Sequence, residues 1–169
     1  MHNSLVLAVS ALLLVSACQS TAPTNTGAAV TEPAAASSAN TTQSAVAAFV
    51  AACVRTADNP NAAGPTLESL GFRKTGGSGP GGTYASSFAT AVVSVDTRSS
   101  SAGQCVVTPK SATFGDVVAL LGSQIAASGV PAMKLGGEEA WILGNTGAVA
   151  LVSRSKGAMT RTQPGVFRG

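Results

Sequence analysis

Three residues in the C-terminal third of the chain combine an aromatic ring with hydrogen-bonding groups. Glu139 and Trp141 lie two positions apart in an alternating segment, so their side chains are expected on one face of a strand, and Asn145 lies in the turn that follows. An aromatic ring beside a few polar groups is a common way to hold a sugar ring. Glu139, Trp141 and Asn145 therefore form a candidate ligand-binding site. The alternative is that Trp141, the only tryptophan, packs into the core while Glu139 lies at the sheet edge.

Catalytic motifs are sparse in the rest of the chain. Residues 77–82 (GSGPGG) match the spacing G-x-G-x-x-G, but a strand is expected to follow them, whereas a dinucleotide loop leads into a helix. Residues 153–156 (SRSK) match S-x-x-K, yet the S-D-N and K-T-G elements of penicillin-binding enzymes are absent. Among the carboxylates that a glycosidase would need, Asp58 and Asp116 lie at predicted helix ends, and Glu68 lies on an amphipathic helix. We expect no catalytic residues and no enzyme activity.

The N-terminal segment has the pattern of an export signal. Residues 5–15 form an apolar run that is too short to span a bilayer and ends in the sequence VSAC at positions 15–18. This sequence resembles the lipobox of bacterial lipoproteins, in which the signal is cleaved before a lipidated cysteine. The resemblance implies that residues 1–17 are a signal peptide and that Cys18 carries a thioether-linked diacylglycerol and an acyl chain on its amino group. Such a lipid anchors the protein to a membrane, and no other cofactor is expected.

The same resemblance implies a location in the bacterial cell envelope. Residue 19 is Gln rather than Asp, which in lipoproteins of enterobacterial type favours the outer membrane. We therefore expect a lipid-anchored protein that faces the periplasm. Removal of the signal also removes His2, the only histidine, so the mature chain has no imidazole for a Ser-His-Asp or Cys-His site.

Two cysteines remain once Cys18 is assigned to the lipid. In an exported, oxidising setting, the pair Cys53 and Cys105 favours a disulfide over metal ligation or nucleophilic chemistry. Two cysteines without a histidine are also too few for a structural zinc site, so no metal is expected. The bridge would close a loop of about 50 residues.

Charge and length limit the classes of partner. The chain has 10 basic and 7 acidic residues, a formal net charge of +3, and its basic residues are scattered rather than gathered in a stripe. This distribution argues against nucleic acid as a partner. About 150 residues remain after the signal, which is enough for one domain with a substantial core.

The predicted organisation is a tether followed by one domain. Residues 18–43 are rich in Ala, Thr, Ser and Pro and are predicted to be flexible, whereas residues 44–169 carry helical and strand periodicities. Helices are predicted from Ser44, at residues 65–70 and after Thr113, which can cap the last of them. Strands are predicted at residues 72–74, 85–96, 104–108, 139–143, 148–153 and 158–162. The fold class is α+β, with a mostly antiparallel sheet of about five to six short strands, two main helices on one face and one disulfide.

The leading functional hypothesis is a non-catalytic envelope lipoprotein that binds another envelope protein or has a structural role. The alternative is a module that binds peptidoglycan or another cell-wall glycan through the face of Trp141. An inhibitor of a foreign hydrolase is a less favoured form of the same hypothesis. A cell-wall enzyme is also less favoured, because titratable groups are sparse.

Overall fold

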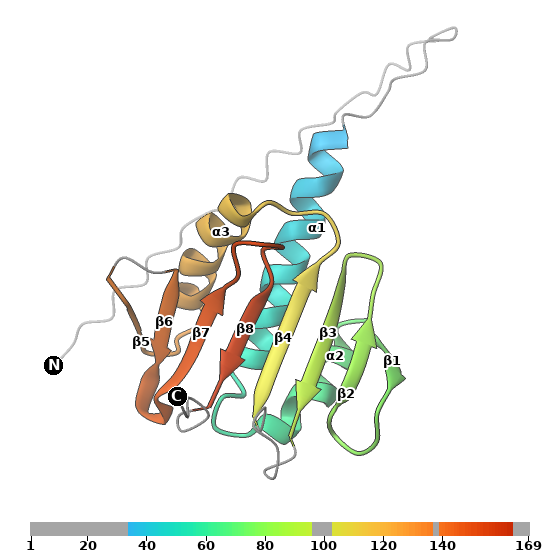
Figure 1. Ribbon diagram of the computed structural model, residues 1–169, viewed down its shortest axis with the longest axis vertical. Helices are drawn as coiled ribbons and strands as arrows, with labels where there is room; N and C mark the ends of the chain where they lie inside the picture. The colour runs from blue at the N-terminus through green and yellow to red at the C-terminus, as the bar shows by residue number, and fades with distance from the viewer. Residues whose placement is uncertain (1–33, 96–102, 137–138, 164–169) are drawn as a thin grey trace, which may run out of the picture. The chain divides into compact units, whose positions relative to one another are not determined.

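Eight strands form one antiparallel sheet in the order β1-β2-β3-β4-β8-β7-β6-β5 (Figure 1). The computed structural model describes residues 34–95, 103–136 and 139–163. The strands are β1 (Arg73–Gly76), β2 (Gly82–Ala85), β3 (Ala89–Ser94), β4 (Gln104–Pro109), β5 (Ala132–Lys134), β6 (Ala140–Leu143), β7 (Ala148–Val152) and β8 (Met159–Thr162). The sheet thus consists of two meanders, β1 to β4 and β5 to β8, joined where β4 pairs with β8.

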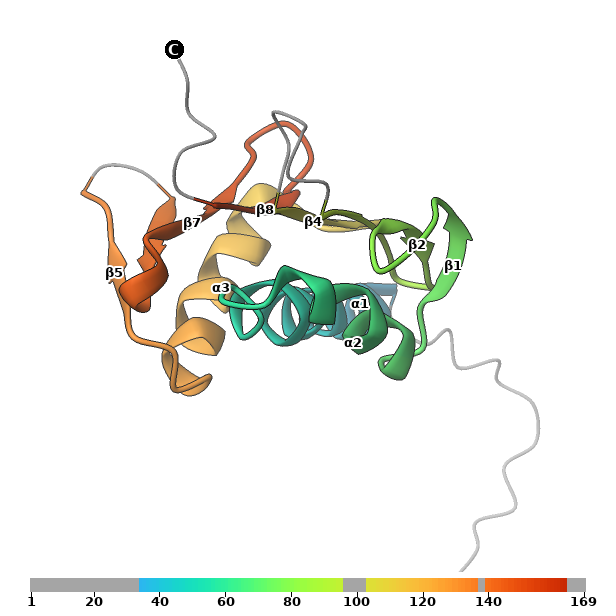
Figure 2. The ribbon, with the colours of Figure 1, turned by 90° about the horizontal axis from the view of Figure 1, so that it is seen from below.

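The α-helices lie together on one face of this sheet (Figure 2). They are α1 (Ala34–Phe49), which continues into the π-helical turn η1 (Val50–Val54), α2 (Ala63–Ser69), preceded by the 3-10 turn η2 (Pro60–Ala62), and α3 (Phe114–Ala127). A further 3-10 turn, η3 (Gly144–Thr146), connects β6 to β7. The core lies between these helices and the side chains that alternate along the strands, such as Ala89, Ala91 and Val93 of β3. In the described part of the chain, no helix is long and apolar enough to cross a membrane.

The α+β class and the antiparallel pairing are confirmed, but the expected strand number was too low. The sheet has eight strands rather than five to six, because β2 and β5 were not predicted. Both are short and flanked by glycine or proline, and their pairing depends on the neighbouring strand rather than on local pattern. The predicted strand 85–96 is interrupted by a turn in which the hydroxyl oxygen of Ser86 accepts hydrogen bonds from the backbone N–H groups of Phe88 and Ala89.

The helices also differ from the prediction. The structure has three α-helices, of which α2 corresponds to the short helix predicted at residues 65–70, and α1 begins at Ala34 rather than at Ser44. Residues 34–43 therefore belong to a helix and not to a tether. Alanine has the highest helix propensity, and Thr42, which is buried, donates a hydrogen bond to the Ser111 carbonyl oxygen at 3.4 Å. The predicted signal peptide, Cys18 and the tether up to residue 33 lie outside the described residues.

The N-terminus of α3 matches the sequence prediction. Thr113 is the N-cap, and its hydroxyl oxygen accepts a hydrogen bond from the backbone N–H of Asp116 at 3.2 Å. The Asp116 carboxylate accepts one from the backbone N–H of Thr113 in return, at 3.3 Å. This reciprocal pair is a capping box, and it fixes where α3 begins.

A pair of helical glycines provides a test of the packing around α2. Gly64 is buried, and a Cβ added there would overlap the carbonyl oxygen of Pro80 and the hydroxyl of Tyr84. We expect Gly64→Ala to lower the free energy of unfolding by about 1 to 2 kcal/mol, even though alanine favours a helix over glycine by about 1 kcal/mol.

Gly122→Ala in α3 is the matched control. Its added Cβ would lie 3.6 Å from Cζ2 of Trp141, an ordinary contact, so the variant should be as stable as wild type or up to about 1 kcal/mol more stable. Urea denaturation of both variants measures the difference. Equal stabilities would show that α2 can move away from β2 at little cost.

Candidate functional site

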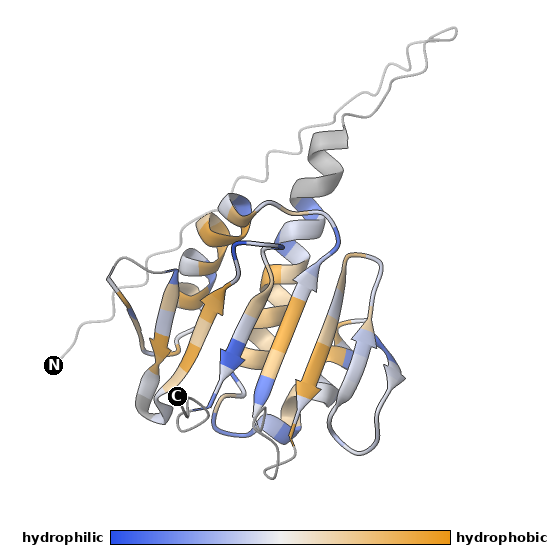
Figure 3. Ribbon diagram, in the orientation of Figure 1, coloured by the Kyte–Doolittle hydropathy of each residue, from blue (hydrophilic) through white to orange (hydrophobic). Residues whose placement is uncertain are grey.

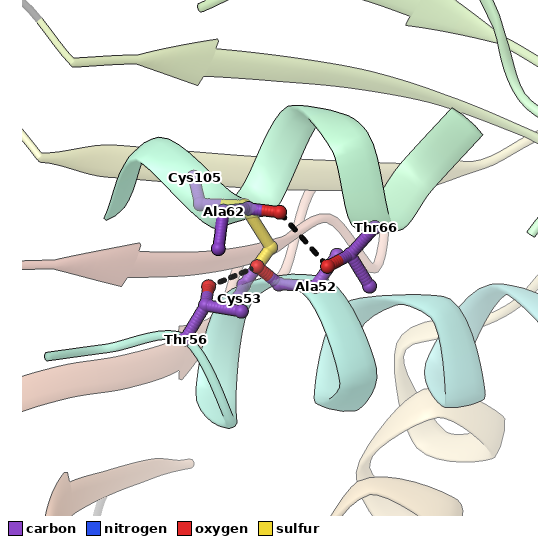
Figure 4. The surroundings of a disulfide bond; sticks show 6 residues. All are labelled: Ala52, Cys53, Thr56, Ala62, Thr66 and Cys105. Atoms are coloured by element: carbon purple, nitrogen blue, oxygen red, sulfur yellow. Dashed lines mark hydrogen bonds between the residues drawn. A yellow bond between two sulfur atoms is a disulfide. The ribbon is translucent and has the colours of Figure 1, made fainter. Parts of the chain in front are cut away.

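A buried disulfide joins the helical layer to the middle of the sheet (Figure 4). Cys53 in η1 is bonded to Cys105 in β4, 52 residues later, and both are 0% exposed. The predicted bridge is therefore confirmed. The neighbouring hydroxyl of Thr56 donates to the carbonyl oxygen of Ala52, so it is satisfied within its own helical segment. The bridge fixes η1 against the helical side of β4, next to the pairing of β4 with β8.

The most unusual side chain in the core is that of Arg161. In the ladders of β8, Arg161 lies directly opposite Cys105 of β4 and Ala150 of β7. Residues opposite one another share a face of the sheet, and Cys105 points to η1, so Arg161 also points toward the helices. It is 0% exposed, and its Nε, Nη1 and Nη2 have no hydrogen-bond partner in the described part of the chain. Figure 3 shows this hydrophilic stretch of β8 between strands with hydrophobic segments.

Burial lowers the pKa of the Arg161 guanidinium to about 10. The group is still protonated near neutral pH, so the core contains a positive charge. Charges in protein interiors are normally paired, because removing an ion from water costs several kcal/mol. Arg161 is therefore expected to decrease the stability of the domain.

The lowered pKa makes this cost depend on pH. The folded-state pKa of Arg161 lies well below the usual range of an arginine, so the unfolded chain binds more protons at alkaline pH, and the cost begins to be relieved as pH rises through about 10. We expect Arg161→Met to be more stable than wild type at neutral pH, and this advantage to shrink as pH rises above about 10. Burial, with a smaller effect of Glu68, raises the pKa of Tyr84, which destabilises both proteins at alkaline pH and cancels in the comparison. Urea denaturation of both proteins at each pH measures the gap; a constant gap would contradict the assignment.

A cleft opens on the helical side at one end of the sheet. Its volume is about 250 Å³, and it lies between the residues that follow η1, the α3–β5 connection and the β6–η3 turn. The lining residues are Val54, Arg55, Ala57, Asp58, Gly129, Val130, Pro131, Leu143, Gly144 and Thr146. The carbonyl oxygen of Ala57 accepts a hydrogen bond from Nε2 of Gln163 at 2.6 Å. This bond ties the end of β8 to a wall of the cleft.

The structure places Trp141 in the core rather than at an open surface. Trp141 is 6% exposed, and α3 approaches it at Gly122. Nζ of Lys134 lies 5.6 Å from the ring centroid and 3.0 Å from Oε2 of Glu139. Asn145 lies in η3, after β6. This arrangement fits the alternative that Trp141 is a core residue, because little of its ring is accessible to a sugar.

The opposite face of the sheet has no helix over it in the described residues (Figure 2). We define the open face as the side chains of β3, β4, β6, β7 and β8 that point away from the helices. They are Thr90, Val92, Ser94, Gln104, Val106, Thr108, Ala140, Ile142, Val149, Leu151, Thr160 and Thr162. None of these twelve side chains is charged, and Val92, on β3 at one side of the open face, is 49% exposed. Sheets that are polar on their solvent side are the common arrangement, so an uncharged face rich in valine and threonine is notable.

Arg161 was not among the candidates from sequence. A single arginine in a short strand is normally read as solvent-exposed. The sequence held one sign of its burial. Arg161 lies two residues after the apolar Met159 and therefore on the same face of the strand. No group of three His, Cys, Asp or Glu that could hold a metal occurs among the described residues.

In comparisons with known proteins, no protein-family model matches the chain, and neither curated proteins nor solved structures give a match.

Proposed function

We propose that this protein is a lipid-anchored lipoprotein of the bacterial envelope whose domain binds another envelope protein, without catalysis, through the open face of its sheet. The lipobox-like sequence VSAC at positions 15–18 supports the anchor on Cys18, with the domain facing the periplasm from the outer membrane. The observation that carries the binding function is the uncharged open face, with Val92 of β3 half exposed on it.

The dimensions and chemistry of the open face favour a protein partner. With strands about 4.8 Å apart and a rise of about 3.3 Å per residue, its strands present a surface of roughly 300 Å² or more, on which apolar and uncharged polar side chains are mixed. The face is built from a pleated sheet rather than from a pocket, which suits a flat protein surface better than a small ligand. It also lacks the basic side chains that nucleic acid would require.

Site-specific photocrosslinking in intact cells tests the proposal. A photoreactive residue at Val92 should form one covalent adduct of defined mass with an envelope protein, whereas the same residue at Ser123, exposed on α3 on the helical side, should not. Val106→Lys, which puts a charge on the neighbouring strand, should reduce the Val92 adduct strongly.

The anchor is tested in the same cells. Cys18→Ala should move the protein from the membrane to the soluble fraction, and mass spectrometry of the wild type should find lipid on Cys18. The same adducts at Val92 and Ser123, or no adduct at Val92, would contradict a partner on the open face. Cell-wall fragments in place of a protein adduct would favour the glycan-binding alternative.

A further inference from the structure

Arg161 has no acidic partner within the described part of the chain. Asp58 and Glu68 are exposed, Asp116 caps α3, and Glu139 is paired with Lys134. The guanidinium thus retains all its hydrogen-bonding capacity in a place with no water contact. A buried polar group without a partner requires an explanation, and one recognised explanation is an ion or ligand that binds there.

The cleft described above is close to Arg161 along two chain segments. Gln163 lies two residues beyond Arg161, and its side chain bonds the carbonyl oxygen of Ala57, a wall residue of the cleft. On the other side, Leu143 lines the cleft two residues after Trp141. Trp141, Ala150 and Arg161 are cross-strand neighbours in one row of the sheet. Leu143 is therefore one row of side chains, or about 7 Å, and two strands, or about 10 Å, away from Arg161. The cleft comes nearer at Val54, which follows Cys53, because the disulfide partner Cys105 lies directly opposite Arg161.

We propose that Arg161 is the anion-binding group of a ligand site that is entered through this cleft. The ligand is a small amphipathic anion: its apolar part occupies the cleft, against Val54, Val130 and Leu143, and its carboxylate or phosphate head pairs with the guanidinium. A planar guanidinium offers parallel N–H donors that match either head group. To reach Arg161, the head group displaces the hydrogen bond between Gln163 and Ala57.

Two features of the site agree with this assignment. The cleft, at about 250 Å³, is slightly smaller than the usual pocket for a drug-sized molecule, so the ligand is small. Most of its side chains are apolar, and its two charged residues, Arg55 and Asp58, are exposed and of opposite sign. Because the charges of Arg55 and Asp58 offset one another, the buried charge of Arg161 makes the site prefer an anion.

Thermal unfolding and NMR titration with defined probes test the site. Sodium hexanoate and hexyl phosphate should each raise the melting temperature of the full mature domain in a saturable manner, and should shift the methyl resonances of Leu143 and Val130. Uncharged 1-hexanol, and sodium chloride at the same ionic strength, should not. A comparison of the two anionic probes distinguishes a carboxylate site from a phosphate site.

Variants separate binding from a general effect of charge. Arg161→Met should weaken the binding of the anionic probe by about tenfold or more, because it removes charge-assisted hydrogen bonds. Arg161→Lys keeps the charge and should retain part of the affinity, and Arg55→Gln, at the exposed rim, should change it by less than about twofold. Circular dichroism confirms that each variant is folded. Equal effects of hexanoate and hexanol, or wild-type binding by Arg161→Met, would overturn the proposal, whatever the result of the crosslinking at Val92.

Discussion

Arg161→Met is expected to raise the free energy of unfolding by about 1 to 4 kcal/mol near neutral pH. The guanidinium is 0% exposed and without a partner in the described residues, so the folded state carries a desolvation cost that the unfolded chain does not. Methionine is unbranched and adaptable, and can fill the same space beside Met159 without a charge. Urea denaturation in a buffer without organic anions measures the change. A loss of stability would mean that Arg161 is paired in solution.

Arg154→Met provides the control for the loss of one positive charge. Arg154 is exposed in the β7–β8 connection, with its guanidinium carbon 5.8 Å from the centroid of the Phe114 ring. An exposed cation–π contact of this kind contributes about 0.5 to 1 kcal/mol, so this substitution should be slightly destabilising. A gain in stability for Arg161→Met together with a loss for Arg154→Met would show that the gain comes from the burial of Arg161 and not from the change in net charge.

The double substitution Cys53→Ala with Cys105→Ala is expected to lower the free energy of unfolding by about 4 kcal/mol. The bridge closes a loop with a sequence separation of 52, and the entropy that such a loop removes from the unfolded chain corresponds to about this value. Urea denaturation of the wild type and the double variant measures it. A loss below about 1 kcal/mol would contradict the expected contribution of the bridge.

Reduction of the wild-type protein provides an independent control. Both cysteines are 0% exposed, so a dithiol should reduce the bridge slowly under native conditions and rapidly in denaturant. The reduced protein should then match the double variant in stability. A bridge that is reduced rapidly without denaturant would show that η1 opens readily from β4.

Sequence predicted those parts of the fold whose signals are local. The hairpins between β3 and β4 and between β6 and β7 follow from alternating residues around turns, and the start of α3 follows from Thr113 and Asp116. β2 and β5 were missed because their few residues become strands only through pairing with a longer neighbour. The start of α1 was placed too late because Ser and Thr in residues 37–44 argued against a helix, whereas contact with the rest of the domain stabilises it.

The candidate site was predictable only in part. The pairing of Cys53 with Cys105 followed from the number of cysteines and the implied export, and is confirmed. The aromatic site at Trp141 rested on strand phase, which places a residue on a face but does not say which face is buried. For the same reason the burial of Arg161 could not be predicted, since it depends on the helices that cover β8 and not on the neighbours of Arg161 in sequence.

The position of the disulfide determines how the domain carries mechanical load. If the chain is pulled between α1 and the end of β8, tension passes from η1 through the bond between Cys53 and Cys105 directly into β4. The intervening loop, with α2 and strands β1 to β3, is shielded from that tension while the bond is intact. The load therefore falls on the pairing between β4 and β8, at the end where Cys105 lies opposite Arg161, whereas strands β1 to β3 carry none of this tension while the bridge is intact.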